Sequence, residues 1–302
     1  RYINMEEKKG IVVKVDHVTK DYGKGRGNFD MSFNVHKGEA FGLVGENGAG
    51  KTTIIRQIMG FIKPTSGNIL VYGLNAYKEA ARIKSYVGYV PGEINFPDYR
   101  TGIEFLHVYA NMVGVTDFTY SDTIIKRLQL DIRAYPRRMS KGMKQKTAIV
   151  TALMIQAPLI IMDEPTTGLD PLMRDEFLKI VLEEKERGAT IIMSSNTVEE
   201  LERVCDKVAL VSQGRIVDIA DVNAIRNRSF RDYKIEFNTQ EDYDSFVASR
   251  GDIKKLKPQQ LQAIIRIEKK DEEELMRQLS NKKVKFMTEI NYNLNTYFEE
   301  RR

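Results

Sequence analysis

The sequence contains a single cysteine and no tryptophan among its 302 residues. Cys205 cannot form a disulfide within the chain, which excludes the disulfide-stapled secreted classes and favours a reducing, cytoplasmic location. No apolar run approaches the roughly 20 residues that span a bilayer, so we expect no membrane crossing. Low-complexity tracts and internal repeats are also missing, and the remaining composition is that of an ordinary globular protein.

The sequence also lacks a concentrated block of charge of either sign. Lysine and arginine together exceed aspartate and glutamate by five, and this excess is spread along the chain. Binding to nucleic acid usually shows as a clustered basic patch, so we expect no nucleic acid partner. A mildly positive protein would also suit the surface of an anionic membrane, although an ordinary solvated surface explains the same balance.

Short apolar runs that alternate with helical patterns predict an α/β fold. Residues 40–44 form one such run and lead directly into glycines, a lysine and a helical stretch over 52–59. Helices between the strand patterns indicate a mostly parallel core sheet covered on both faces. An N-terminal antiparallel β region precedes this sheet. The predicted strands are 11–15 and 29–35 in that region, and 86–90, 159–162, 190–193 and 207–211 in the sheet.

The length exceeds that of one ordinary hydrophobic core, so we predict two domains, 11–227 and 228–302. Within the first, a helical subdomain is expected at about 93–157, where Thr101 and Ser121 stand as helix caps. The second alternates strand and helix patterns and is predicted to be a small, ferredoxin-like α+β domain. Its predicted strands are 233–237, 263–268 and 284–288.

Residues Gly45 to Thr52 match the pattern Gly, four residues, Gly-Lys-Thr, between a predicted strand and a predicted helix. Glycines allow successive backbone N–H groups to face phosphates, and the helix N-terminus adds positive potential. By itself this pattern indicates binding of ATP or GTP. Lys51 is expected to reach the β and γ phosphates, and the Thr52 hydroxyl to bind Mg²⁺. A glycine-rich turn before an ordinary helix would not need this lysine and hydroxyl. The expected ATP contacts are Gly45, Asn47, Gly48, Gly50, Lys51, Thr52 and Thr53.

Asp163 and Glu164 directly follow the predicted strand 159–162. Carboxylates at the end of a parallel strand lie at the open edge of a sheet, where α/β proteins bind their ligands. We expect Asp163 to hold Mg²⁺ through water and Glu164 to orient and deprotonate the attacking water. Alone, such a pair is more often a solvated strand end; beside a phosphate-binding loop, the catalytic interpretation is favoured.

Two further motifs resemble those of the ATP-binding cassette (ABC) ATPases. Residues 139–145 contain Ser140 and Gly142 and are similar to the family signature, and residues 166–170 are similar to the D-loop, which ends at Asp170. The resemblance covers roughly residues 11–220. It implies hydrolysis of ATP with Mg²⁺ by a pair of subunits, in which Ser140, Gly142 and Asp170 act at the nucleotide of the partner. It also places Tyr22 at the adenine, although a tyrosine half-buried at a strand end is the alternative.

The sequence departs from that family at two positions. Gly92 stands where the family usually has a glutamine near the metal, and Asn196 stands where it has a histidine that contacts the γ-phosphate. At the first position, a water, Glu93 or the backbone alone would have to replace the glutamine. We expect Asn196 to take part in catalysis with a weaker contact, because its amide is shorter than an imidazole and never charged. A simple helix cap is the alternative for Asn196.

The resemblance implies partners that this sequence does not contain. The helical subdomain is the surface that receives a transmembrane permease subunit, which would place the protein peripherally on the inner face of the membrane. The segment from Phe230 onward, including 294–298, is similar to the extra domain of bacterial exporters of drugs, antimicrobial peptides or peptide toxins. We therefore expect an exporter ATPase. A cassette acting on ribosomes or DNA and a weakly hydrolysing ATP clamp remain alternatives, as does a heterodimer in place of the simpler homodimer.

Overall fold

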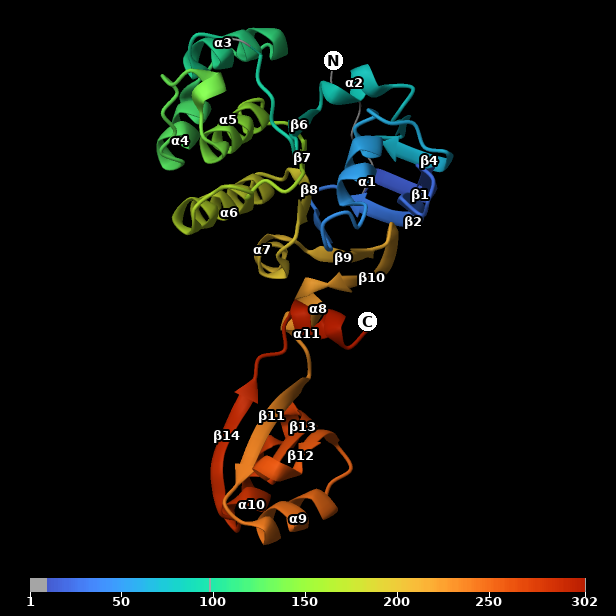
Figure 1. Ribbon diagram of the computed structural model, residues 1–302, viewed down its shortest axis with the longest axis vertical. Coiled ribbons are helices and arrows are strands. Elements are labelled where there is room, and N and C mark those ends of the chain that lie inside the picture. The colour runs from blue at the N-terminus through green and yellow to red at the C-terminus, as the bar shows by residue number, and fades with distance from the viewer. Residues whose placement is uncertain (1–9, 98, 302) are drawn as a thin grey trace. The chain divides into compact units, whose positions relative to one another are not determined.

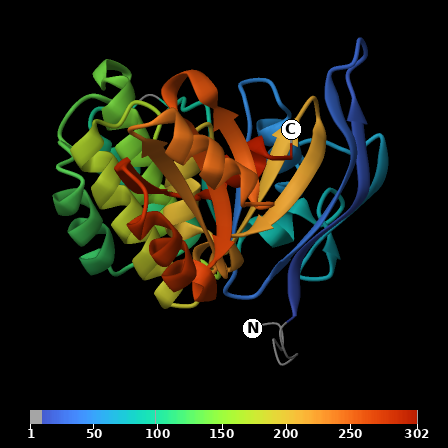
Figure 2. The same ribbon diagram turned by 90° about the horizontal axis from the view of Figure 1, so that it is seen from below.

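The computed structural model describes residues 10–97 and 99–301, and its contacts divide the chain after Asp221 into two compact units. Figure 1 shows the first unit in blue to yellow and the second in orange to red. Within the first unit, the green helices and the blue strands lie on opposite sides in Figure 1 and also in Figure 2. Among the described helices, none combines the length and apolarity that a membrane crossing requires.

A six-stranded sheet forms the centre of the first unit, in the order β10-β9-β3-β8-β7-β6. All neighbouring pairs are parallel except β10 and β9. Every residue of β3, β7 and β8 is buried, as expected for strands covered on both faces. The predicted α/β class with a mostly parallel core sheet is confirmed. The strands are β3 (Ala40–Val44), β6 (Val87–Val90), β7 (Leu159–Met162), β8 (Thr190–Ser195), β9 (Lys207–Ser212) and β10 (Arg215–Asp221).

A second, antiparallel sheet has the order β2-β1-β4-β5. Along β2, buried and exposed residues alternate, which is the period of a strand with one face on the core. The rings of Phe33 and Phe41 stack with their centroids 4.8 Å apart and join this sheet to β3. One hydrophobic core contains side chains of both sheets and of α1. The elements are β1 (Ile11–Asp21), β2 (Gly27–His36), β4 (Ser66–Val71), β5 (Leu74–Asn75) and α1 (Lys51–Ile58).

Helices α3, α4 and α5 lie between β6 and β7 in the chain and pack on one another beside β6 (Figure 1). Thr101 caps α3 as predicted, because its hydroxyl accepts a hydrogen bond from the Glu104 N–H. Ser121 does not cap a helix. The Asp117 carboxylate accepts hydrogen bonds from both the backbone and the hydroxyl of Thr119 and starts α4 earlier. The helices are α3 (Gly102–Val113), α4 (Thr119–Arg127), η1 (Pro136–Arg138) and α5 (Lys141–Leu153).

Of the remaining helices of the first unit, α6 and α7 follow strands of the central sheet, whereas α2 follows β5. Asp170 caps α6, and Thr197 occupies the cap position of α7. They are α2 (Ala80–Lys84), α6 (Pro171–Glu186) and α7 (Val198–Val204).

The second unit is a four-stranded antiparallel sheet in the order β12-β13-β11-β14, with α9 and α10 packed on it. Its element order, β-α-β-β-α-β, is that of ferredoxin-like domains. The predicted boundary was after residue 227, but the unit begins at Val222. The difference arises because α8 packs against α11 and so belongs to this unit. Its elements are α8 (Val222–Arg226), β11 (Phe230–Phe237), α9 (Gln240–Ala248), β12 (Ile253–Lys257), η2 (Pro258–Gln260), β13 (Gln262–Glu268), η3 (Lys269–Asp271), α10 (Glu272–Ser280), β14 (Val284–Ile290) and α11 (Leu294–Glu299).

Candidate functional site

The loop between β3 and α1 brings its backbone into a tight turn. Gly48 and Gly50 have φ angles of 82° and 110°, a region that side-chain-bearing residues rarely adopt. A Cβ atom at Gly45 would lie 2.2 Å from the Val211 carbonyl oxygen, so this position also requires glycine. The first N–H groups of α1, which directly follow this turn, have no partner within the helix.

Lys51 is almost fully buried and its ammonium group is surrounded by oxygen atoms. Its Nζ donates hydrogen bonds to the Gly45 carbonyl at 2.7 Å and to the Glu46 carbonyl at 3.1 Å. It also donates to Asn196 Oδ1 at 2.7 Å and lies 3.4 Å from Glu164 Oε1. A bound phosphate would therefore meet a lysine whose position is already set.

The order of the central sheet explains why residues far apart in sequence meet at this loop. β3 is next to β8, β8 next to β7, and β7 next to β6, all parallel. Their carboxyl ends consequently lie at one edge. The loop follows β3, Asn196 follows β8, Asp163 and Glu164 follow β7, and Gly92 follows β6.

Asn196 connects the three parts of the site. Its Nδ2 donates to Asn47 Oδ1 at 2.9 Å and to Glu164 Oε2 at 3.3 Å, while its Oδ1 accepts from Lys51. The cap of α7 is the next residue, Thr197. The structure thus places the Asn196 side chain among the expected catalytic residues and not on the helix.

Glu164 has an unusual backbone conformation, with a φ of 48°. Left-handed conformations cost energy in residues other than glycine, and such strain clusters at functional sites. The Ser194 hydroxyl accepts a hydrogen bond from the Glu164 N–H at 2.9 Å and helps to hold this turn.

Asp163 is fully buried behind Glu164. Its Oδ1 accepts a hydrogen bond from the Ser194 hydroxyl at 2.7 Å, while its Oδ2 has no partner among the described residues. Burial raises the pKa of the Asp163 carboxyl above its usual value, and the hydrogen bond from Ser194 opposes the rise. A buried carboxylate oxygen without a protein partner is available to a hydrogen-bond donor or a cation.

A cavity of about 200 Å³ opens over the loop. Tyr22 lies on its wall with half of its surface exposed, just beyond the end of β1. The ring is therefore available for stacking on a flat ligand. The lining residues are Tyr22, Arg26, Gly27, Gly48, Gly50, Lys51, Thr52, Thr53 and Glu164.

Ser140, Gly142 and Asp170 do not line this cavity. Ser140 caps α5 by accepting from the Met143 N–H at 3.2 Å, and Asp170 caps α6 by accepting from the Met173 N–H at 3.0 Å. Gly142 packs against Gly168 of the D-loop, since a Cβ at Gly142 would lie 2.7 Å from the Gly168 carbonyl oxygen. The two motifs that carried the resemblance are thus in contact with each other and separate from the phosphate-binding loop.

Three polar residues that support the site belong to none of the sequence motifs. Ser194 holds both Asp163 and Glu164, and Asn28 and Gln57 are buried beside Gly50. The adjacency of β7 and β8 would have pointed to Ser194, because it lies near the end of β8, beside the strand that Asp163 follows. No pattern in the sequence indicated Asn28 or Gln57.

Gly92 lies against the free oxygen of Asp163. A Cβ at this position would be 2.9 Å from Asp163 Oδ2, closer than ordinary contacts. Glu93 is exposed and does not line the cavity. We expect Gly92→Ala to displace the Asp163 carboxylate, to raise the Mg²⁺ concentration for half-maximal ATPase activity several-fold, and to lower kcat. Titration of the activity with Mg²⁺ measures both.

Gly251→Ala is the matched control for Gly92→Ala, because a Cβ there meets no atom within 4 Å and the φ is not positive. Gly92→Gln tests whether the larger family side chain is still accommodated beside the carboxylate. An unchanged Mg²⁺ dependence in both Gly92 variants would show that this position has no influence on the site.

Comparison with known proteins agrees with this geometry. The ABC transporter family matches residues 29–167. The linearmycin resistance ATP-binding protein LnrL of Bacillus subtilis (strain 168) is 35% identical over 243 residues, which cover 79% of this chain and 78% of that protein. The bacitracin transport ATP-binding protein BcrA of Bacillus licheniformis is 33% identical over 229 residues, with 74% and 75% covered.

A solved structure of an ATP-binding subunit of an ABC transporter superposes with a TM-score of 0.65 at 31% identity. The match covers 71% of this chain and 92% of that one. Both the sequence and the architecture of this chain are therefore those of an ABC cassette. The chain belongs to the ABC transporter family and is one of its ATP-binding, ATP-hydrolysing proteins.

Proposed function

We propose that this chain is the ATPase subunit of a bacterial exporter and drives transport through a separate transmembrane subunit. The observation that carries the proposal is the contact of Asn196 with Lys51 and Glu164, two residues that line the cavity over the phosphate-binding loop. A cation, an amide and a carboxylate placed together at the phosphate end suit hydrolysis, and binding alone would not require the carboxylate.

Each residue has a role that its contacts allow. Lys51 would neutralise the β and γ phosphates, and the N–H groups of Gly48 and Gly50 with the neighbouring residues would surround them. Glu164 would accept the proton of the attacking water. Asn196 would keep Glu164 and Lys51 at their mutual spacing and donate a hydrogen bond toward the γ-phosphate.

The residues beside the phosphates also fit Mg²⁺. Asp163 offers a buried oxygen without a partner, and the Thr52 side chain lies close to the same carboxyl group. Residues 10–97 and 99–301 contain no cluster of three or more His, Cys, Asp or Glu side chains suited to a metal. We propose that Asp163 and Thr52 hold the ion together with phosphate oxygens. When bound, it would neutralise phosphate charge.

We further propose that two copies share each ATP. Ser140 and Gly142 are at the N-terminus of α5, where backbone N–H groups favour an anion, and they lie outside the cavity of their own chain. They would face the γ-phosphate bound by a second ATP-binding subunit, with Asp170 beside them. Tyr22 would stack on the adenine at the far end of the cavity.

The direction and cargo of transport are proposed from the relatives. One is named for linearmycin resistance and another for bacitracin transport, and a third, from Rhizobium etli, is named for Nod factor export. An exporter of a drug or antimicrobial peptide is therefore the function that we infer. The permease would place this chain on the inner face of the membrane.

The proposal is tested by expressing a tagged form of the full chain in its native cells and purifying it from detergent extracts. We expect a membrane protein to copurify in fixed stoichiometry, and we expect the complex to hydrolyse ATP. Deletion of the partner should sensitise the cells to a peptide antibiotic. Recovery of ribosomal proteins or DNA in place of a membrane subunit would contradict the exporter function, and an inactive complex would indicate an ATP clamp.

A further inference from the structure

Two fully buried amide side chains lie beside Gly50 and belong to none of the motifs described above. Asn28 is on β2 and Gln57 is on α1, and both are 0% exposed. Gln57 Nε2 donates to Asn28 Oδ1 at 2.9 Å, and Asn28 Nδ2 donates to the Gly50 carbonyl oxygen at 3.0 Å. We call this pair the amide relay. Burial of an amide side chain costs free energy unless its polar atoms form hydrogen bonds.

The direction of the hydrogen bonds in the amide relay is fixed by chemistry. The Gly50 carbonyl can only accept, so Asn28 must present its NH₂ group to it and turn its oxygen to Gln57. Gln57 must then present its own NH₂ group, which also donates to the Thr53 carbonyl at 3.3 Å. Both positions therefore require a side chain that donates, and Asn28 must also accept.

The Gly50 carbonyl controls an N–H group of the phosphate-binding loop. In a planar trans peptide, the C=O of one residue and the N–H of the next point in opposite directions. Gly50 has a φ of 110°, and a Cβ there would lie 2.5 Å from Asn28 Nδ2. The Ile54 N–H donates to the same carbonyl oxygen at 3.1 Å, so the helix and the amide relay together hold the Gly50 carbonyl on one side of the peptide. The Lys51 N–H is therefore held on the other side, and Lys51 lines the cavity.

We infer that the amide relay positions the phosphate-binding loop, holding the Lys51 N–H in the orientation that binds phosphate. Asn28 and Gln57 are positioning residues, because they act through the Gly50–Lys51 peptide and do not line the cavity over the loop. The inference rests on the proposed binding of ATP phosphates at this loop. According to this inference, two buried amides contribute to the affinity of the loop for nucleotide.

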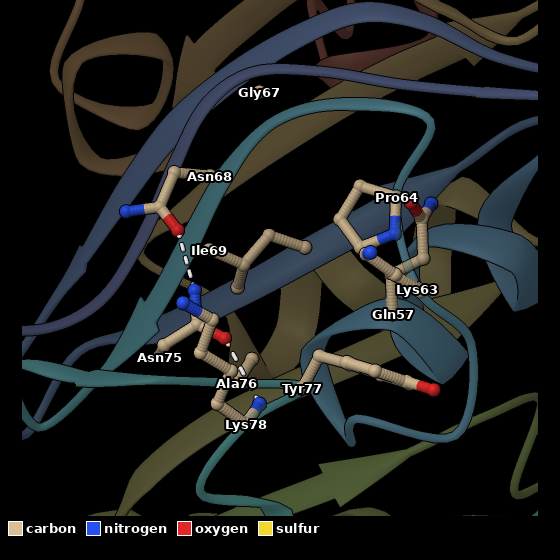
Figure 3. Close-up of a pocket in the computed structure, with 10 residues that line it drawn as sticks. All are labelled: Gln57, Lys63, Pro64, Gly67, Asn68, Ile69, Asn75, Ala76, Tyr77 and Lys78. Carbon is tan, nitrogen blue, oxygen red and sulfur yellow. Dashed lines mark hydrogen bonds between the residues drawn. The ribbon is translucent and has the colours of Figure 1, made fainter.

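Gln57, the member of the amide relay farther from Gly50, can be replaced without a large change in packing. Gln57 Oε1 is buried and has no partner among the described residues, and Gln57 borders a cavity of about 100 Å³ (Figure 3). The cavity wall also includes the apolar residues Pro64, Ile69 and Ala76. Methionine has nearly the length of glutamine and suits a helix, so Gln57→Met removes the donor while the packing persists.

We expect Gln57→Met to raise the Kd for ATP, measured by calorimetry on the full chain, by about tenfold, the size of one well-placed hydrogen bond. KM should rise by a similar factor and kcat should change less, because the loop N–H groups bind the phosphates before and during hydrolysis. The matched control is Gln262→Met in the second unit. Gln262 is also a buried glutamine whose Oε1 has no partner among the described residues.

A second variant, Asn28→Leu, interrupts the relay at its other member. If both residues act through one peptide, Asn28→Leu combined with Gln57→Met should weaken ATP binding no more than Asn28→Leu alone. Independent effects that multiply to about a hundredfold would overturn the relay. The inference would also be overturned if Gln57→Met kept the parental Kd and KM for ATP and lowered Tm only as much as Gln262→Met does. Failure of the unaltered chain to bind ATP would contradict the proposed function itself.

Discussion

Replacing Glu164 with glutamine is expected to lower kcat for ATP hydrolysis by about 10²- to 10⁴-fold, the usual contribution of a general base. Glutamine keeps the length of the side chain, and it can still accept the hydrogen bond from Asn196 Nδ2, which is 3.3 Å away. It cannot take a proton from water. The substitution therefore removes the chemistry and leaves the shape of the site.

ATP binding should persist in Glu164→Gln. The change removes a negative charge 3.4 Å from Lys51 Nζ, so the site should repel a polyphosphate less than before. The left-handed backbone at Glu164 is no harder for glutamine than for glutamate, and we expect no loss of stability from it. Steady-state ATPase assays and calorimetry with ATP measure kcat and Kd separately.

The control for this prediction is Glu176→Gln on α6. Its side chain is 24% exposed against 25% for Glu164, and it also pairs with a cation, Arg127, at 2.6 Å. Loss of that pair should cost at most about 1 kcal/mol of stability and leave kcat unchanged. A Glu164→Gln enzyme that kept more than a tenth of the parental kcat would exclude Glu164 as the base.

The sequence was sufficient for the elements that are short, apolar and sharply bounded. β3 and β7 have the limits expected from their residues, because each is a buried run that ends at a glycine or a carboxylate. β12 was missed because four of its five residues are exposed and three are lysines. β10 was missed for a similar reason, and its turn through Gln213 and Gly214, both with positive φ, is specified locally.

The candidate site could be predicted only as far as motifs and chain order reach. Asn196 contacts both Lys51 and Glu164 because β8 lies between β3 and β7. The sequence does not state which strands are neighbours, so this contact could not be predicted from it. Gln57 and Asn28 have polar side chains, which a sequence-based prediction would ordinarily assign to the surface. Their burial depends on packing between β2 and α1, which no local pattern encodes.

Replacing Asn196 with alanine is expected to lower kcat by roughly 10- to 100-fold, because three hydrogen bonds at the catalytic centre are lost together. Lys51 and Glu164 would then be free to approach each other more closely, which would weaken the lysine's contact with phosphate and the basicity of the carboxylate. KM should rise less than kcat falls. The control is Asn293→Ala, which removes the cap of α11 in the second unit and should affect stability alone.

Asn196→His tests the same position in the opposite direction. An imidazole is longer than the amide and can donate a charge-assisted hydrogen bond to the γ-phosphate when Glu164 stabilises its protonated form. We therefore expect kcat to rise, by up to about tenfold if one hydrogen bond strengthens by the usual difference between neutral and charged donors. Parental kcat in both Asn196→Ala and Asn196→His would show that this side chain has no part in hydrolysis. A fall in Asn196→Ala with no rise in Asn196→His would mean that its contacts within the site matter more than the one to phosphate.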